Sequence, residues 1–290
     1  MDRLVGIWRE ARAVERAAYA VGAVLFAWGL VNVLVLLVTG GSWEGPLSLR
    51  KAATFGLSFG LTLVAVAWAT SFARIGPRRL LLGLFGGASV GEVVLVSVQA
   101  WRGVPSHFNF ETPVDTAISM TLAAGGGVLI LTAVAFTATA VAGTRTTSPT
   151  MRVAVRFGLV TLLAALGTGA AMIARGVVSA RTGDPQIAYT TAGALKPLHA
   201  VAMHGILVLP ALAWLLDSTS WSPRRRMALV WAGVGAYTAL TVIVGVESLT
   251  GVSPLAPPVV VGIASGLALA VLTVVGVVAL YGVRAKPAAL

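Results

Sequence analysis

Apolar residues form eight long runs that are separated by short polar links. The runs cover about residues 17–38, 52–73, 79–100, 115–142, 152–178, 197–216, 226–248 and 257–282. Each run is long enough to cross a hydrocarbon core of roughly 30 Å as an α-helix. The pattern therefore predicts an all-α, polytopic membrane protein, a bundle of about eight transmembrane helices.

The two ends of the chain differ from these runs. Residues 1–16 interleave arginines and acidic residues with Leu4, Val5, Ile7 and Trp8, which predicts a short amphipathic helix at the membrane interface. The apolar run that follows is too long for the core of a signal peptide, so we interpret it as the first span. Residues 17–284 are then expected to form a single transmembrane helical domain, and residues 285–290 a short cytoplasmic tail.

The composition excludes a soluble domain. Hydrophobic residues make up 57% of the chain and charged residues only 11%, so the bilayer must be the solvent for most side chains. The 33 glycines suit close helix–helix packing. The absence of cysteine excludes disulfides, iron–sulfur clusters and thiolate metal sites.

The basic residues predict how the spans are oriented. Fifteen of the 21 Lys and Arg lie in the N-terminal segment, in the links 74–79, 145–156 and 224–226, and near the C-terminus at Arg284 and Lys286. The positive-inside rule then places both termini in the cytoplasm, and we expect a multi-pass protein of a bacterial cytoplasmic membrane. Topology explains the net charge of +11 without nucleic acid, and no nucleic-acid partner is expected.

The link from Trp101 to Asp115 concentrates reactive side chains outside the membrane. We take Ser106, His107 and Asp115 of this link, together with Glu92 of the preceding span, as candidate catalytic residues. For Asp115, which opens a span after Pro113, a helix N-cap is an equally good interpretation.

Further polar residues lie at or below the same membrane surface. Glu92 and His204 are each about 12 Å inside the outer ends of their spans. Ionisable groups at such depth usually face a bundle interior or a water-filled cavity. We therefore predict one polar cavity that is open to the extracytoplasmic side and holds both residues. The alternatives are a buried acid at Glu92 that joins two helices and a packing histidine at His204. The candidate substrate-binding residues around this cavity are Lys51, Gln99, Arg102, Asn109, Arg175 and Lys196.

The chain has three histidines, and their spacing limits a metal site. His199 and His204 are five residues apart, so they point roughly 140° apart on a regular helix. Only one of them can face His107. We expect His199 to join His107 in binding zinc or another divalent metal, with His204 beside Glu92. Acid–base catalysis by the same histidines is the alternative.

Three short segments resemble a known family. They are Arg50-Lys51 followed by Phe55 and Ser58, the run Gln99-Ala-Trp-Arg-Gly-Val-Pro-Ser-His-Phe-Asn109, and the pair His199 and His204. In this order they resemble a family of uncharacterised bacterial multi-span membrane proteins. The resemblance covers most of residues 45–215 and implies no mechanism.

The order of Ser106, His107, Asp115 and the later histidine pair is similar to that in a second group, the superfamily of alkaline ceramidases and adiponectin receptors. Those proteins are membrane hydrolases with a three-histidine zinc site and an assisting Ser and Asp. Here four residues rather than three separate the histidine pair, and eight spans rather than seven are predicted. The resemblance thus implies an analogous mechanism rather than membership.

These patterns favour a membrane enzyme, a metal-assisted hydrolase or transferase. Its substrate would be a lipid or amphiphile with an anionic or polar headgroup, which basic side chains bind through charge-assisted hydrogen bonds. One alternative is a transporter or binding protein for a small anion or lipid. Another is a b-type haem protein with His107 and His199 or His204 as axial ligands. Membrane lipids and a small-molecule or lipid substrate are the expected partners, and the sequence does not indicate an oligomeric state.

Overall fold

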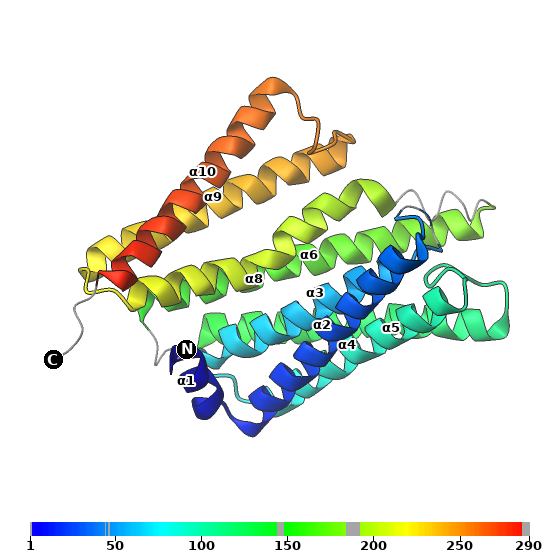
Figure 1. The fold of residues 1–290 in the computed structure, drawn as a ribbon, viewed down its shortest axis with the longest axis horizontal. Helices are drawn as coiled ribbons and strands as arrows, with labels where there is room; N and C mark the ends of the chain where they lie inside the picture. Colours follow the sequence, from blue (N-terminus) through cyan, green and yellow to red (C-terminus); the bar gives the residue numbers. More distant parts are fainter. Residues whose placement is uncertain (1, 44, 46, 144–147, 184–191, 286–290) are drawn as a thin grey trace. The chain divides into compact units, whose positions relative to one another are not determined.

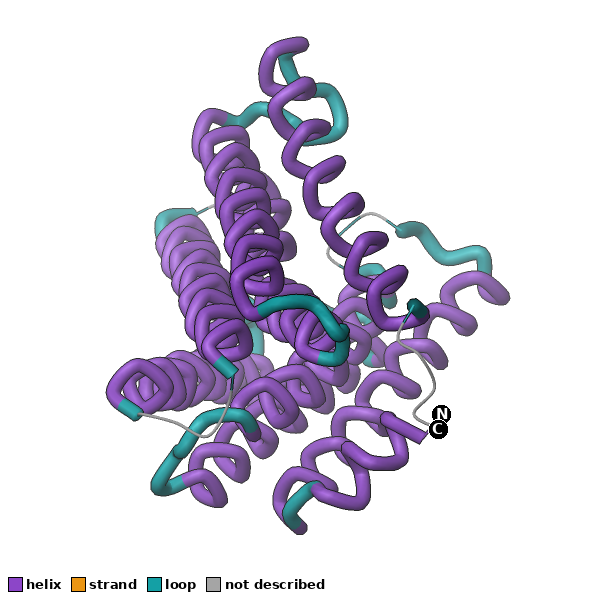
Figure 2. The backbone as a smooth tube through the Cα atoms, turned by 90° about the vertical axis from the view of Figure 1, so that its left-hand side faces the viewer, coloured by secondary structure: helices purple, strands orange, loops and turns teal. Residues whose placement is uncertain are grey.

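A computed structural model describes residues 2–43, 45, 47–143, 148–183 and 192–285. All regular secondary structure in these residues is helical (Figure 2). Eight of the described helices are long and apolar enough to cross a membrane. They are α2 (Ala13–Thr39), α3 (Arg50–Ser71), α4 (Arg78–Trp101), α5 (Pro113–Ala142), α6 (Pro149–Arg181), α8 (Lys196–Asp217), α9 (Pro223–Thr250) and α10 (Val259–Arg284).

The prediction of an all-α polytopic bundle is confirmed, and each helix ends within four residues of its predicted boundary. The chain is therefore an integral, multi-pass membrane protein. Its orientation and its bacterial membrane stay predictions. A short helix α1 (Asp2–Glu10) precedes α2, and a 3₁₀ turn, η1 (Ala192–Leu195), leads into α8. Apart from residue 285, the predicted tail lies outside the described residues.

The chain divides into two compact units, and α5 and α6 contribute to both. The first unit comprises Met1–Ser71, Gly76–Phe136 and Ala170–Ala192. The second comprises Phe72–Ile75, Thr137–Gly169 and Gly193–Leu290.

Glycines bring α2 and α3 of the first unit into backbone contact (Figure 1). A Cβ atom on Gly29 would lie 2.5 Å from the Leu57 nitrogen, and one on Gly56 would lie 2.6 Å from the Gly29 Cα. A Cβ on Gly60 would meet the Gly22 carbonyl at 2.6 Å. Such close approach gains dispersion contacts that lipid cannot replace.

A buried ion pair holds α4 against α2 and α3. Arg78 Nε donates to Glu15 Oε1 at 2.8 Å, and each side chain is at most 4% exposed. The remaining donors of Arg78 reach the carbonyls of Thr70 and Ala67. Because every charged group has hydrogen-bond partners, this pair is tolerated inside the bundle.

In the second unit, α9 packs against α8 and α10. Leu240 and Val244 of α9 form an apolar core with Ala268 of α10, covered by Leu198 and Val201 of α8. At the opposite end of α8, Thr150 Oγ1 donates to Asp217 at 2.6 Å, and Ser148 bonds to the same carboxylate. These bonds attach the beginning of α6 to the end of α8.

Candidate functional site

The predicted site residues of the first unit gather around the link 102–112, and the sequence explains how this link leaves α4 and enters α5. Gly103 adopts a φ of 68°, a conformation natural to glycine, and its N–H donates to the Ala100 carbonyl as the helix ends. Pro113 then occupies the first position of α5, where its missing N–H costs nothing. The Thr112 hydroxyl caps the helix by accepting from the Asp115 N–H at 3.1 Å.

A network of polar side chains ties the two ends of this link together. Gln99 Nε2 and Arg102 Nη1 each donate to Asp115 Oδ1 at 2.8 Å. Thr112 Oγ1 donates to the other oxygen, Oδ2, at 2.6 Å, and Arg102 also bonds to Gln99 Oε1. Asp115 is only 2% exposed. Since both carboxylate oxygens are engaged, Asp115 acts in this arrangement as the anchor of the link.

Ser106 and His107 form the candidate catalytic pair of the link. Ser106 is buried, and its Oγ lies 3.0 Å from His107 Nδ1. With the imidazole proton on Nε2, the serine hydroxyl donates to Nδ1, which is the contact that a nucleophile needs with a general base.

The surroundings of His107 keep its imidazole neutral. Its ring lies 5.8 Å from that of Phe55 on α3 and 5.9 Å from that of Phe108. Burial lowers the pKa of His107 well below its usual range, and the positive charge of Lys51 lowers this pKa further. A histidine that stays neutral is competent to accept a proton.

Asn109 supplies an unpaired hydrogen-bond donor in the same link. It is 1% exposed, and its Nδ2 has no partner among the described residues. The rest of Asn109 is held firmly: Ser119 Oγ of α5 donates to its carbonyl at 3.0 Å, and its Oδ1 accepts from the Glu111 N–H at 3.1 Å. An orphaned buried donor is rare in proteins and calls for a ligand or a water.

The backbone is strained at Phe108, which adopts a φ of 61° although it carries a large side chain. Its ring packs on Gly176 of α6, where a Cβ atom would lie 2.3 Å from Phe108 Cζ. This contact holds the link to α6, beside the predicted binding residue Arg175, whose side chain is exposed. Strained residues of this kind cluster at functional sites.

Glu92 lies on the face of α4 that packs against α5. It is 5% exposed, and its Oε1 occupies the space that a Cβ atom on Gly125 would need, at 2.9 Å. Lys51 of α3 acts electrostatically on both Glu92 and His107. The first unit thus brings Lys51, Glu92, the Ser106–His107 pair and Asn109 into one neighbourhood.

The opposite face of α4 forms an apolar groove with α2. The groove has a volume of about 780 Å³, and Trp28, Val94, Val98 and Trp101 are among its lining residues. Two tryptophans of the groove donate hydrogen bonds between the helices. Trp28 Nε1 donates to Ser97 Oγ at 2.8 Å, and Trp101 Nε1 donates to Asn32 Oδ1 at 3.1 Å. These bonds join α2 to α4 and lie outside the polar cluster.

The other predicted residues, Lys196, His199 and His204, belong to the second unit. His199 Nδ1 lies 2.7 Å from the Ala165 carbonyl of α6, and its ring packs against Gly169. His204 is exposed, and its Nδ1 lies 2.6 Å from the Ala200 carbonyl of its own helix. The two histidines therefore have different surroundings. Their predicted meeting with His107 and Glu92 stays a prediction.

No group of three or more His, Asp or Glu residues within the described chain is placed to hold a metal ion. The contact with Ser106 occupies Nδ1 of His107, so Nε2 is the ring atom that remains for a ligand. Zinc binding by His107 with a histidine of α8 stays a prediction, as does haem binding.

Two residues that shape this site, Thr112 and Ser119, were not among the predicted ones. A signal for Thr112 exists, because a threonine three residues before an acid at the start of an apolar run is typical of a capping box. Ser119 is four residues after Asp115 and so lies on the same helix face.

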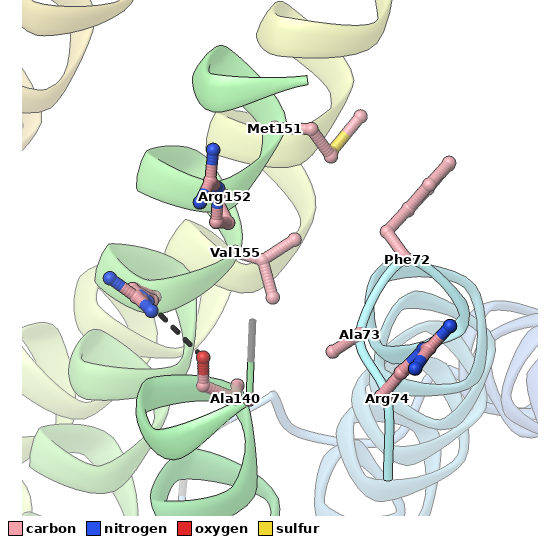
Figure 3. Close-up of a pocket in the computed structure, with 9 residues that line it drawn as sticks. Phe72, Ala73, Arg74, Ala140, Met151, Arg152 and Val155 are labelled. Carbon is pink, nitrogen blue, oxygen red and sulfur yellow. Dashed lines mark hydrogen bonds between the residues drawn. The ribbon is translucent and has the colours of Figure 1, made fainter. Parts of the chain in front are cut away.

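A small pocket lies in the second unit, where α5 ends and α6 begins (Figure 3). Its volume of about 20 Å³ is enough for one water. Arg74, Arg152 and Arg156 line it. Arg156 Nε donates to the Ala140 carbonyl at 3.1 Å and so satisfies the end of α5 (Figure 3).

Comparison with known families, with characterised proteins and with solved structures finds no match to this chain.

Proposed function

We propose that this integral membrane protein is an enzyme, a hydrolase or transferase, that acts on a lipid or amphiphile with an anionic or polar headgroup. The observation that carries the proposal is the buried contact between Ser106 Oγ and His107 Nδ1, at 3.0 Å. The unpaired amide of Asn109 in the same link supports it.

In the proposed reaction, Ser106 Oγ attacks the carbonyl carbon of an ester and its proton passes to His107 Nδ1. His107 returns this proton to the departing alcohol, and water or a second alcohol then releases the acyl group from Ser106. Asn109 Nδ2 is the candidate donor to the oxyanion that forms in between. Gln99 and Asp115 hold Arg102 at the end of α4.

Lys51 and Arg102 would bind the headgroup, with Arg175 beside the contact between Phe108 and Gly176. The predicted orientation opens this site to the extracytoplasmic side. A divalent metal on Nε2 of His107 would activate a water molecule in place of the serine, and assays with and without chelator separate the two mechanisms.

The test uses the purified full-length protein in lipid nanodiscs with ester-linked lipids whose headgroups are anionic, zwitterionic or neutral. Released fatty acid is measured for the parent and for Ser106→Ala. We expect the variant to lose at least about 100-fold in turnover, the low end of what a positioned catalytic group contributes. Ser58→Ala is the matched control, because among the described residues the Ser58 hydroxyl bonds only to the Thr54 carbonyl of its own helix.

Turnover by Ser106→Ala at the parent rate would refute the role of Ser106. A parent that binds anionic lipid without turning it over, and loses binding in Lys51→Gln, would instead indicate the transporter or binding protein.

A further inference from the structure

Glu247 is a buried acid in the second unit, and its side chain has no partner in the part of the chain that the structure describes. It lies in the last turn of α9, three residues before the helix ends at Thr250. Glu247 and its neighbour Ser248 are each 3% exposed. Within the described residues, neither side-chain oxygen of Glu247 nor Ser248 Oγ has a hydrogen-bond partner. The Glu247 main-chain carbonyl, by contrast, accepts from the Val252 N–H at 2.9 Å.

The carboxyl group lies on the face of α9 that packs against its neighbours. Val244 and Leu240 precede Glu247 by three and seven residues, so all three share one helix face. Leu240 and Val244 belong to the apolar core with Ala268 of α10 and Leu198 of α8.

The titratable and basic groups of the packed helices leave Glu247 unpaired. On α8 they are Lys196, His199, His204 and Asp217, the last residue of that helix. On α10 they are Tyr281 and Arg284, at the end of the helix farthest from its first residue. None of them forms an ion pair or a hydrogen bond with Glu247 among the described residues. The two histidines contact carbonyl oxygens instead.

Three physical effects oppose a negative charge at this position. Burial away from water removes the hydration of a carboxylate. The C-terminal end of a helix carries partial negative charge, which repels an anion. No hydrogen-bond donor in the described part of the chain replaces the lost water. A species that neutralises the carboxylate must therefore accompany it while the helices are packed.

The number of oxygen ligands selects a proton over a metal cation. Hard cations such as calcium take about 6–8 oxygen ligands, whereas Glu247 and Ser248 together offer three unpaired side-chain oxygens. A proton needs one. Ionisable residues within membrane spans commonly serve as ion or proton sites.

We propose that Glu247 is a proton-binding site of the second unit. Its proton comes from the water beyond the exposed residues Thr250 and Gly251, and it is released when the end of α9 separates from α8 and α10. The site is independent of the Ser106–His107 pair, which lies in the first unit.

Dicyclohexylcarbodiimide tests the proposal on the full-length protein in vesicles, because this apolar reagent modifies protonated carboxyl groups in apolar surroundings. Site-resolved mass spectrometry should find Glu247 modified at mildly acidic pH and progressively less modified at alkaline pH. Glu111, an exposed acid, should stay unmodified and serves as the internal control. Glu247→Gln should lose the modification, and Glu111→Gln should keep it at Glu247.

Three outcomes would overturn the proposal. One is an unmodified Glu247 in a sample whose mass spectra cover that peptide. A second is modification that does not depend on pH. A third is protection by sodium at constant pH and ionic strength, which would indicate a cation site.

Discussion

At the scale of single residues, the site combines anchored groups with groups that are left available. Asp115 has both oxygens engaged, whereas Asn109 Nδ2 has no partner among the described residues. His107 precedes both of them in the chain, and its ring lies next to the serine hydroxyl. This division suits the proposed reaction, in which fixed residues would position the link while neutral or unpaired groups would meet the substrate.

The neutral state of His107 predicts a pH dependence. A folded-state pKa below the usual value makes the neutral form dominant down to acidic pH, so activity should fall only as the pH drops below the usual histidine range. Stability falls as the pH drops from the usual histidine pKa toward the lower folded-state pKa of His107, because over that range the unfolded chain binds the proton and the folded chain does not. Lys51→Gln removes one of the two causes, so the pKa should rise while burial still keeps it low.

The measurement is a pH titration of the His107 ring signal by nuclear magnetic resonance with labelled histidine. Arg50→Gln is the control, because Arg50 Nε donates to the Trp43 carbonyl and is not among the groups that act on His107. An identical titration in Lys51→Gln would show that the two side chains do not interact.

The contacts of Asp115 predict that its replacement lowers the stability of the protein. In Asp115→Ala, the donors Gln99 Nε2, Arg102 Nη1 and Thr112 Oγ1 each lose the carboxylate as an acceptor. We expect a cost of about 1–3 kcal/mol in the free energy of unfolding, the usual penalty for stranded buried groups. Thermal unfolding in detergent measures it. Glu111→Ala, an exposed acid of the same link, should change the stability by no more than about 0.5 kcal/mol.

At the scale of elements, backbone contact between helices defines the first unit. Gly29 and Gly56 leave no space for a side chain between α2 and α3. Gly56→Ala would place a Cβ atom 2.6 Å from the Gly29 backbone, so one helix must shift. We expect a destabilisation of about 1–3 kcal/mol, as for other overpacked interiors.

Gly87→Ala on α4 is the matched control, because nothing lies within 4 Å of its added Cβ. There the better helix propensity of alanine should stabilise the protein by up to about 1 kcal/mol. Reversible unfolding in detergent compares the two variants. Equal stabilities would contradict the backbone contact between α2 and α3.

At the scale of the whole molecule, the sequence predicts the spans but not their partners. Hydropathy identifies all eight long helices because a bilayer leaves a chain few other ways to pair its backbone groups. The sequence predicts one interfacial segment over residues 1–16, whereas α2 begins at Ala13 and buries Glu15 against Arg78, 63 residues away. Which helix faces meet depends on the packing of complete helices, and a run of apolar residues carries little information about it.

For the same reason, the sequence predicts which residues belong to the candidate site but not which contacts they make. The sequence indicates the link and its Ser, His and Asp residues, because polar side chains stand out between apolar spans. It cannot show that Asp115 bonds to Gln99 or that Phe108 packs on Gly176, since these contacts depend on how α4, α5 and α6 are placed.

The orientation in the membrane is the last prediction. Three spans, α5, α6 and α8, lie between Glu111 and Ser222, so these two exposed residues must lie on opposite sides. The excess of basic residues places Ser222 in the cytoplasm. The chain has no cysteine, so a maleimide labels only the single cysteine that is introduced. Glu111→Cys should react with a membrane-impermeant maleimide on intact cells, and Ser222→Cys only after permeabilisation. Reaction of both from outside would contradict the three intervening spans, and the reverse pattern would invert the orientation and place the Ser106–His107 site at the cytoplasmic face.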